Sequence, residues 1–210
     1  MPVKNRVRIS AAYNNFNNEI QRLEKFDFSN HKKFISKELS KPQIELLVES
    51  IFFASYRAYE NFLREIFLLY CLEKQSSKKP KVKSYLKPKD FAHAELLIKS
   101  SMHFLDWTKP DDVIARADLY LENGHPIKLP YTTNLQKLKD FKKLRNHIAH
   151  NSLESELQFE KLVSNYYGGV KPLILPTPGQ YLMLSSKIKR GNYLLLDFFD
   201  IMKQISIDLT

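Results

Sequence analysis

One short segment of the sequence gathers side chains suited to acid–base chemistry on an anion: Arg145-Asn146-His147-Ile148-Ala149-His150. Imidazole is the side chain best suited to moving a proton at neutral pH. Guanidinium carries a permanent positive charge, and its fork of N–H donors matches the oxygens of a phosphate. Asn146 adds an amide that can contact a phosphate or orient a neighbouring histidine. The segment therefore combines a proton-transferring group with an anion-binding one.

The apolar pattern before this segment predicts a helix over residues 134–152, with Thr133 as its cap. On a wheel of about 100° per residue, the apolar residues share one arc that should face the core. They are Leu138, Phe141, Leu144, Ile148 and Ala149. Arg145 falls near the middle of this arc. A buried arginine is rare unless it is paired, so Arg145 should either meet a carboxylate or line a cleft.

Glu60 is the candidate carboxylate for Arg145. It lies on a long helix predicted over residues 40–72, which is apolar on nearly all sides and therefore expected to be central. The alternative is that Glu60 pairs with Arg64, four residues later on the same helix.

The polar face of the motif helix is basic. His150 shares it with Asn146, Lys143 and Lys139, so Lys139 and Lys143 are candidate contacts for the backbone of a nucleic acid. Arg145 and His150 lie about 140° apart on the wheel. They can flank one cleft only if the helix end bends or if a second subunit supplies part of the site.

His147 points in a third direction. His147 and His150, three residues apart, could share a metal ion, but no third ligand is evident, so we expect neither a metal nor a cofactor. A histidine near a helix C-terminus often only offsets the helix dipole, and that alternative stays open for His150.

The composition narrows the class of protein. The formal net charge is +10 and the pI is near 9.5, which favours a polyanionic partner, nucleic acid before a membrane surface. Charged residues interrupt the most apolar stretch, so we expect no membrane span. The single cysteine, Cys71, and the absence of an apolar leader favour a cytoplasmic protein.

Scarce glycine and apolar residues at three- and four-residue spacing predict an all-α protein, with residues 1–210 forming a single domain. A lysine-rich stretch at residues 74–89 is expected to be an exposed loop, with a phosphate-contacting role as the alternative. Residues 124–130 should form a turn and residues 168–179 an irregular segment, with room for a short strand near residues 181–184. Further helices are expected over residues 7–26, 90–107, 110–121, 154–167 and 192–207.

The string LRNHIAHNS, residues 144–152, resembles the signature of the HEPN superfamily: an arginine, usually a polar residue, then a histidine after a gap of four to six residues. Arg145, Asn146 and His150 match these positions. The aromatic-rich stretch around residues 56–62 also looks like the central helix of that family. The chain particularly resembles stand-alone bacterial HEPN proteins of the RiboL-PSP type, and a decorated HEPN-like helical bundle with long loops is the fold that this implies.

The resemblance implies a metal-independent endoribonuclease, often part of a toxin–antitoxin or phage-defence system, that acts on RNA as a homodimer and can have an antitoxin or defence-system partner. Arg145, Asn146 and His150 would then be catalytic, with Glu60 and His147 supporting them and Lys139 and Lys143 binding RNA. Two alternatives stay open. One is a catalytically inactive HEPN module that binds nucleic acid or a partner protein, and the other is a subunit that binds a nucleotidyltransferase and its nucleotide.

Overall fold

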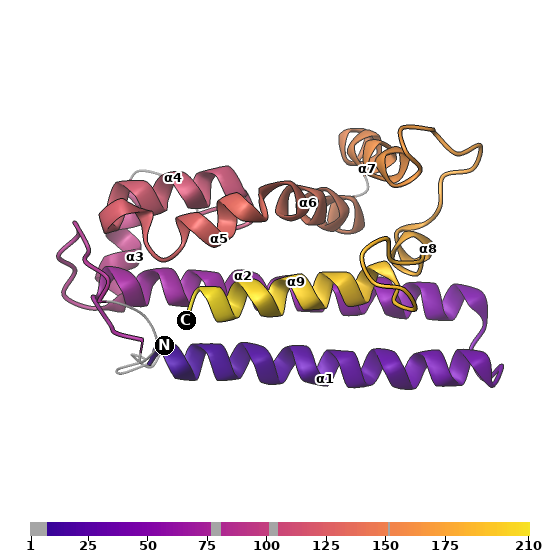
Figure 1. Ribbon diagram of the computed structural model, residues 1–210, viewed down its shortest axis with the longest axis horizontal. Helices are drawn as coiled ribbons and strands as arrows, with labels where there is room; N and C mark the ends of the chain where they lie inside the picture. Colours follow the sequence, from indigo (N-terminus) through magenta and orange to yellow (C-terminus); the bar gives the residue numbers. More distant parts are fainter. Residues whose placement is uncertain (1–7, 77–80, 101–104, 151) are drawn as a thin grey trace. The chain divides into compact units, whose positions relative to one another are not determined.

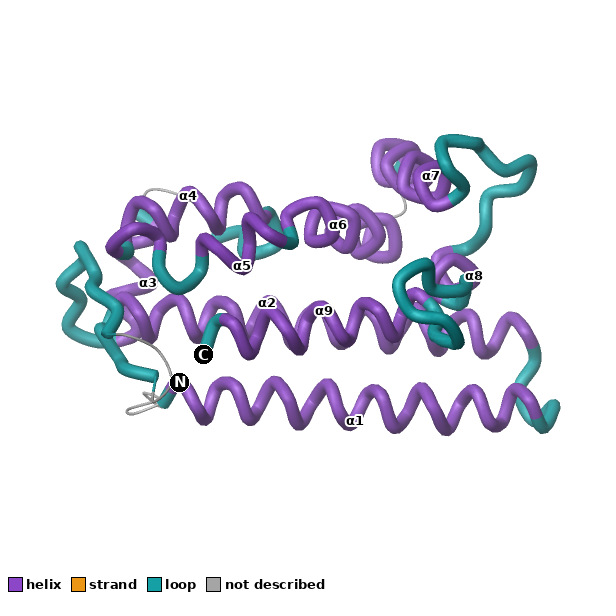
Figure 2. The backbone as a smooth tube through the Cα atoms, viewed as in Figure 1, coloured by secondary structure: helices purple, strands orange, loops and turns teal. Residues whose placement is uncertain are grey.

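The computed structural model describes residues 8–76, 81–100, 105–150 and 152–210, and its secondary structure there is helical, with no β-strand (Figures 1 and 2). The elements are α1 (Ile9–Ile35), α2 (Lys41–Cys71), α3 (Phe91–Lys99), α4 (Pro110–Tyr120), the 3-10 helix η1 (Glu122–Gly124), α5 (Lys128–Thr133), α6 (Leu135–His150), α7 (Leu153–Tyr166), α8 (Pro178–Leu182) and α9 (Leu194–Asp208). The all-α class predicted from the sequence is therefore confirmed for these residues.

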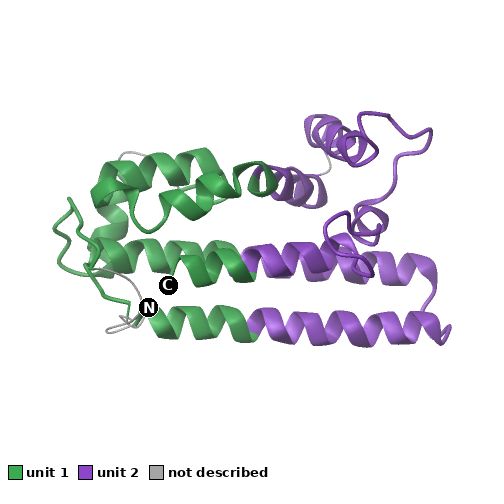
Figure 3. Cartoon of the chain, viewed as in Figure 1, with its two compact units in different colours: residues 1–18, 59–138, 203–210 green, residues 19–58, 139–202 purple. Residues whose placement is uncertain are grey.

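The chain divides into two compact units, and α1, α2, α6 and α9 each run from one into the other (Figure 3). Unit 1 comprises residues 1–18, 59–138 and 203–210, and unit 2 comprises residues 19–58 and 139–202. The motif segment belongs to unit 2. That the whole chain is one domain stays a prediction.

The core of unit 1 is built on aromatic contacts along α2. The Phe16 ring from α1 stacks on Phe62 at 4.8 Å between centroids. The buried hydroxyl of Tyr59 donates a hydrogen bond of 2.8 Å to the hydroxyl of Tyr131 on α5. This bond satisfies two polar atoms that burial would otherwise leave without a partner, at a cost of about 1–3 kcal/mol each.

The core of unit 2 centres on Phe198 of α9. Its ring lies 4.6 Å from that of Phe52 on α2 and 4.8 Å from that of Phe141 on α6, the latter edge to face. Phe141 belongs to the apolar arc predicted on the motif helix. These contacts hold α6 against α2 and α9 and so fix the direction in which its polar face points.

Several helices have ends close to the predicted positions, and local contacts cap some of them. The Ser40 amide donates to the Gln43 side chain at 2.8 Å just before α2 begins at Lys41. Helix α4 begins with Pro110, and α7 begins after Ser152, whose hydroxyl accepts from the Ser155 amide. Helices α2, α4, α7 and α9 each begin and end within two residues of the predicted positions.

The first helix is longer than predicted, because α1 continues nine residues past Phe26 to Ile35. Its continuation carries polar residues that the sequence does not mark as core. Asp27 and Asn30 are nevertheless buried, and Tyr193 donates a hydrogen bond to Asp27. Tertiary contacts within unit 2 therefore stabilise a helical turn that has little apolar periodicity. The predicted start at Val7 lies outside the described residues.

The third helix is shorter than predicted. Asp90 caps it, since its side chain accepts from the His93 amide, but α3 ends at Lys99. Ser100 has φ of 47° and ψ of −121°, which departs from helical backbone angles and ends the helix. Residues 101–104 lie outside the described residues. Trp107, predicted as the helix end, lies instead in a non-helical segment and packs on Phe67 at 5.2 Å.

The predicted turn at residues 124–130 was only partly right, because residues from Lys128 onward form α5. Thr133 is the last residue of α5 rather than the cap of α6. Helix α6 starts at Leu135 and ends at His150, and residue 151 lies outside the described residues. The predicted stripe is also wrong at Ala149, which is exposed.

The strand allowed for near residues 181–184 is wrong. Thr177 and Gln180 form a capping box, and Pro178 occupies the first helical position, so this segment begins the short helix α8. Close by, Ser185 and Tyr193 form an isolated antiparallel bridge.

The lysine-rich stretch is irregular, as predicted, in its described residues, and residues 77–80 lie outside them. It is less exposed than expected, because Val82 and Ser84 are buried. Lys83 pairs with Glu122 and Lys87 with Glu73, each at 3.2 Å. Part of its positive charge is therefore neutralised by neighbouring carboxylates.

Candidate functional site

Helix α6 places the motif residues on different faces. It is helical from Leu135 through His150 without interruption, so Arg145 and His150 keep the angular separation expected from five residues of helix. Leu144 is buried in the core of unit 2, Arg145 is partly buried and His150 is exposed. One chain therefore presents the imidazole to solvent and holds the guanidinium closer to the core.

Arg145 lies against an aromatic ring on α2. Its guanidinium carbon is 5.8 Å from the centroid of Phe53, within the range of a cation–π contact. Its Nη1 donates to the side-chain oxygen of Asn146 at 3.3 Å. The aromatic ring accounts for an arginine on an otherwise apolar arc and limits the directions in which the guanidinium can point. Asn146 is engaged with Arg145.

The predicted pairing of Arg145 with Glu60 stays a prediction, because Glu60 belongs to unit 1 and Arg145 to unit 2. Arg64, the alternative partner predicted for Glu60, contacts another carboxylate of unit 1. Arg64 forms a two-pronged salt bridge with Glu95 of α3, with N–O distances of 2.7 and 2.5 Å. The guanidinium of Arg64 is thus directed at α3.

His147 serves as a packing residue between α6 and α7. Its ring stacks on buried Phe159, with centroids 4.7 Å apart and 14° between the planes. Burial lowers the pKa of His147, and the charge of Glu156 opposes that shift. The Nδ1 atom is buried without a hydrogen-bond partner among the described residues. His147 therefore favours the neutral form and contributes to the packing of α6 on α7.

The two lysines predicted to bind a nucleic-acid backbone lie on α6 in unit 2, and both are partly buried. Lys143 forms a salt bridge of 2.8 Å with Asp140, one turn earlier on the same helix. The predicted basic face did not include this acid, although its i,i+3 spacing from Lys143 is a signal in the sequence. It reduces the charge that Lys143 offers to a phosphate.

Within the described residues, no group of three or more His, Cys, Asp or Glu side chains is placed to hold a metal ion. None of the helices described has the length and apolar character needed to span a membrane.

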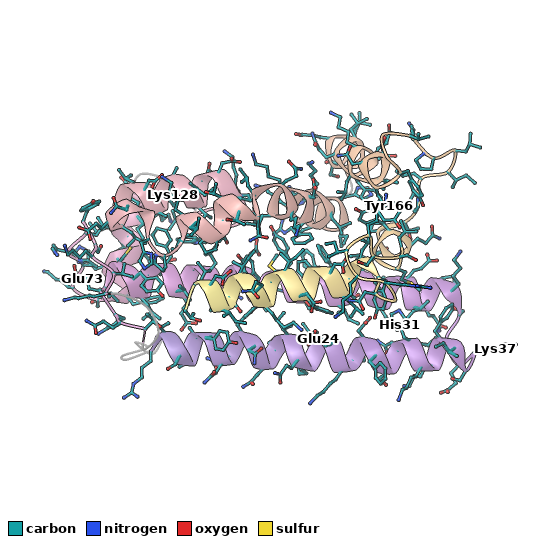
Figure 4. All side chains as sticks on the ribbon, in the orientation of Figure 1. Glu24, His31, Lys37, Glu73, Lys128 and Tyr166 are labelled. Atoms are coloured by element: carbon teal, nitrogen blue, oxygen red, sulfur yellow. The ribbon has the colours of Figure 1, made fainter. Side chains whose placement is uncertain are left out.

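A polar cluster that the sequence did not reveal links α1 to the start of α9. Buried Asp27 accepts a hydrogen bond from the Tyr193 hydroxyl, and its second oxygen lies 3.3 Å from Nδ1 of His31. The His31 ring, labelled on α1 in Figure 4, stacks on Tyr193 at 4.7 Å. Only the i,i+4 spacing of Asp27 and His31 was a signal, because Tyr193 lies 166 residues beyond Asp27.

We expect the free energy of unfolding to fall as the pH rises above 6.5, because of this cluster. The hydrogen bond to Asp27 raises the pKa of His31 above its ordinary 6.5, although burial opposes the shift. The stabilisation is therefore fully present below pH 6.5 and is lost as the pH rises through the raised value. His147 affects stability in a separate pH range. Because its pKa is lowered in the folded chain, the free energy of unfolding falls as the pH drops below 6.5.

Urea unfolding of wild type and His31→Gln over this range measures the effect. In His31→Gln, the free energy of unfolding should no longer fall as the pH rises above 6.5. It should still fall as the pH drops below 6.5, because His147 is unchanged. Asp27→Asn should also lose the upper decline, because it removes the carboxylate that raises the pKa. An unchanged pH profile in His31→Gln contradicts the assignment.

Comparison with protein-family models, curated proteins and solved structures found no match to this chain. The resemblance to the HEPN superfamily therefore rests on the residues of the chain itself.

Proposed function

We propose that this chain is a metal-independent endoribonuclease of the HEPN type. The observation that carries the proposal is the arrangement on α6, where an exposed imidazole at the helix end follows a guanidinium held against Phe53. The net charge of +10 adds a general attraction for a polyanion. Arg145, Asn146 and His150 are the proposed catalytic residues.

RNA supplies its own nucleophile in this proposal. The 2′-oxygen forms a bond to the adjacent phosphorus, and the bond from phosphorus to the 5′-oxygen breaks. The products are a 2′,3′-cyclic phosphate and a 5′-hydroxyl. His150 transfers the proton, either from the 2′-hydroxyl as a base or to the leaving 5′-oxygen as an acid. Arg145 stabilises the negative charge on the phosphoryl oxygens, and Asn146 orients its guanidinium.

A homodimer is part of the proposal. Arg145 and His150 of one chain diverge on a continuous helix, so a composite site would take the guanidinium from one subunit and the imidazole from the other. Two imidazoles at one cleft would also provide a base and an acid for the same reaction. A cellular role as a toxin or phage-defence nuclease, with an antitoxin or other partner protein, follows from the same resemblance.

We expect the purified chain to cleave RNA in the presence of EDTA and to leave DNA of the same sequence intact. A mechanism that uses a 2′-hydroxyl, an imidazole and a guanidinium requires no divalent ion, and DNA lacks the nucleophile. Total cellular RNA serves as the first substrate, and mapping of the product ends should reveal 2′,3′-cyclic phosphates. Products that carry 3′-hydroxyl ends, or cleavage that stops in EDTA, contradict this mechanism. If no RNA pool is cut, the inactive binding module becomes the better account.

A further inference from the structure

A long stretch of unit 2 carries only positive charge. Residues 161–196 contain no aspartate or glutamate, and their five basic residues are Lys161, Lys171, Lys187, Lys189 and Arg190. Lys171 pairs with Glu160 at 2.8 Å, just before this stretch. The other four are exposed, and three of them lie in residues 186–192, which we call the basic turn.

The basic turn has a defined conformation and is attached to the end of α7. The Ser186 hydroxyl accepts hydrogen bonds from the amides of Ile188 and Lys189, and the Ser186 amide donates to the Asn192 carbonyl. The hydroxyl of Tyr166, labelled in Figure 4, donates to the Ser185 carbonyl at 2.9 Å. The start of the basic turn is therefore attached to Tyr166.

Two tyrosines occupy the junction of α7 with this turn. The Lys187 amine lies 4.5 Å above the Tyr166 ring and also donates to the Tyr166 carbonyl. Tyr167 meets Tyr166 edge to face, with centroids 5.0 Å apart and 87° between the planes. Tyr167 is 43% exposed. The Tyr167 ring is thus oriented by Tyr166, whose own ring carries the Lys187 amine, and it is accessible to a ligand.

A series of ring contacts connects this junction with the motif helix. From His147 the contacts run through Phe159 and Tyr181 to Tyr166 and Tyr167, and none of the four centroid distances exceeds 6.0 Å. All five rings belong to unit 2, together with His150. Packed rings within unit 2 therefore connect the exposed Tyr167 ring with the helix that carries the motif.

The lysine-rich stretch at residues 74–89 is the competing surface, because it also combines lysines with an exposed aromatic residue, Tyr85. Its charge is less available, since Lys83 and Lys87 pair with Glu122 and Glu73. It also belongs to unit 1, whereas the motif belongs to unit 2.

We propose that Tyr167 and the basic turn bind single-stranded RNA, with one unpaired base stacked on the Tyr167 ring and the adjacent phosphates contacted by Lys189 and Arg190. This inference rests on the proposed ribonuclease function and specifies its substrate as unpaired RNA. Aromatic stacking beside a basic groove is the usual means of binding single strands, since every base has a face that can stack. A base inside a duplex is already stacked on its neighbours and cannot occupy this position.

The test measures binding of a fluorescein-labelled single-stranded oligoribonucleotide of about a dozen nucleotides by anisotropy. The full chain carries His150→Ala, so that turnover does not consume the probe. Tyr167→Ala should weaken binding roughly tenfold, and Tyr167→Trp should retain it, because loss of one stacked base has about that effect. The double variant Lys189→Ala/Arg190→Ala should reduce the slope of log affinity against log salt by about 1.4, since each phosphate on a single strand contributes roughly 0.7.

Phe28→Ala is the matched control. Phe28 lies on α1 in unit 2, is 62% exposed and has the Lys32 amine 4.4 Å above its ring, but it lies outside the acid-free stretch. Phe28→Ala and Tyr85→Ala should both bind as the parent chain does. An equal loss in either control overturns the proposal, as does unchanged binding in Tyr167→Ala together with an unchanged salt slope in the double variant. Equal affinity for the same probe annealed to its complement also overturns it.

The two proposals fail separately. If the wild-type chain cuts RNA but binding does not depend on Tyr167, only the proposed binding surface is wrong. If binding depends on Tyr167 but no RNA is cut, the ribonuclease proposal is wrong and the single-strand surface stands.

Discussion

His150→Ala is expected to reduce RNA cleavage at least 100-fold, because proton transfer by a positioned side chain contributes roughly 100- to 10,000-fold to such reactions. Binding of RNA should change little, since the attraction comes from the basic residues of unit 2 and not from one exposed imidazole. The free energy of unfolding should also be nearly unchanged, because His150 is exposed at the end of α6. Initial rates, anisotropy and urea unfolding measure the three quantities separately.

Lys137→Ala is the control for His150→Ala. It removes an exposed side chain from the same helix and should cut RNA at the wild-type rate. If His150→Ala cleaves as fast as this control, His150 is not catalytic, and offsetting the helix dipole becomes the better account of this residue.

A mixing experiment extends the same prediction to the proposed dimer. Arg145→Ala should be as inactive as His150→Ala, but a mixed dimer of the two contains one composite site with both groups intact. Co-refolding the two inactive variants should therefore restore part of the activity if the sites are shared between subunits. If the mixture stays inactive while wild type is active, a shared site that needs only one guanidinium and one imidazole from different subunits is wrong.

Gly179→Ala is expected to destabilise the chain by about 3 kcal/mol, the upper part of the range for forcing an extra carbon into a packed site. A Cβ at this position would lie 2.4 Å from the carbonyl oxygen of Glu45 and 2.8 Å from its Cα. Both are backbone atoms of α2, which cannot move aside as a flexible side chain can. The substitution must therefore shift α8 away from α2.

Such a shift would also weaken the polar contacts that hold α8 in place. The Gly179 amide donates to Glu49 at 2.9 Å, and the Gln180 side chain donates to Glu45 at 3.0 Å. The Thr177 hydroxyl donates to Glu45 at 3.1 Å. Glu45 is buried, so loss of its donors leaves a carboxylate in a poorly solvated position.

Thermal and urea unfolding test this prediction, with Gly168→Ala as the control. Gly168 also has no side chain, but nothing lies within 4 Å of the position of its Cβ. Its φ of 74° makes alanine unfavourable by roughly 1 kcal/mol through backbone strain alone. A loss of stability in Gly179→Ala no larger than that in Gly168→Ala would mean that α8 accommodates the added carbon.

The local features of the fold could be predicted from the sequence. Apolar residues at helical spacing mark α2, α4, α7 and α9, and each of these helices begins within two residues of its predicted position. The position of the motif at the end of an amphipathic helix was also predictable, because Leu138, Phe141 and Leu144 fix the inward face of α6. These features depend on side chains a few residues apart, and such spacing is written directly in the sequence.

Only the tertiary structure decided the features that join distant residues. Helix α1 extends to Ile35 because Tyr193 meets Asp27, and α8 is held at Glu45, more than a hundred residues away. Phe53 determines where the Arg145 guanidinium lies, and Tyr166 orients Tyr167 beside a turn that a second segment provides. Periodicity indicates that a residue is buried or exposed, but not which distant side chain it meets. The helix carrying the motif was thus determined by the sequence, while the surroundings of its side chains depend on packing between segments far apart in the chain.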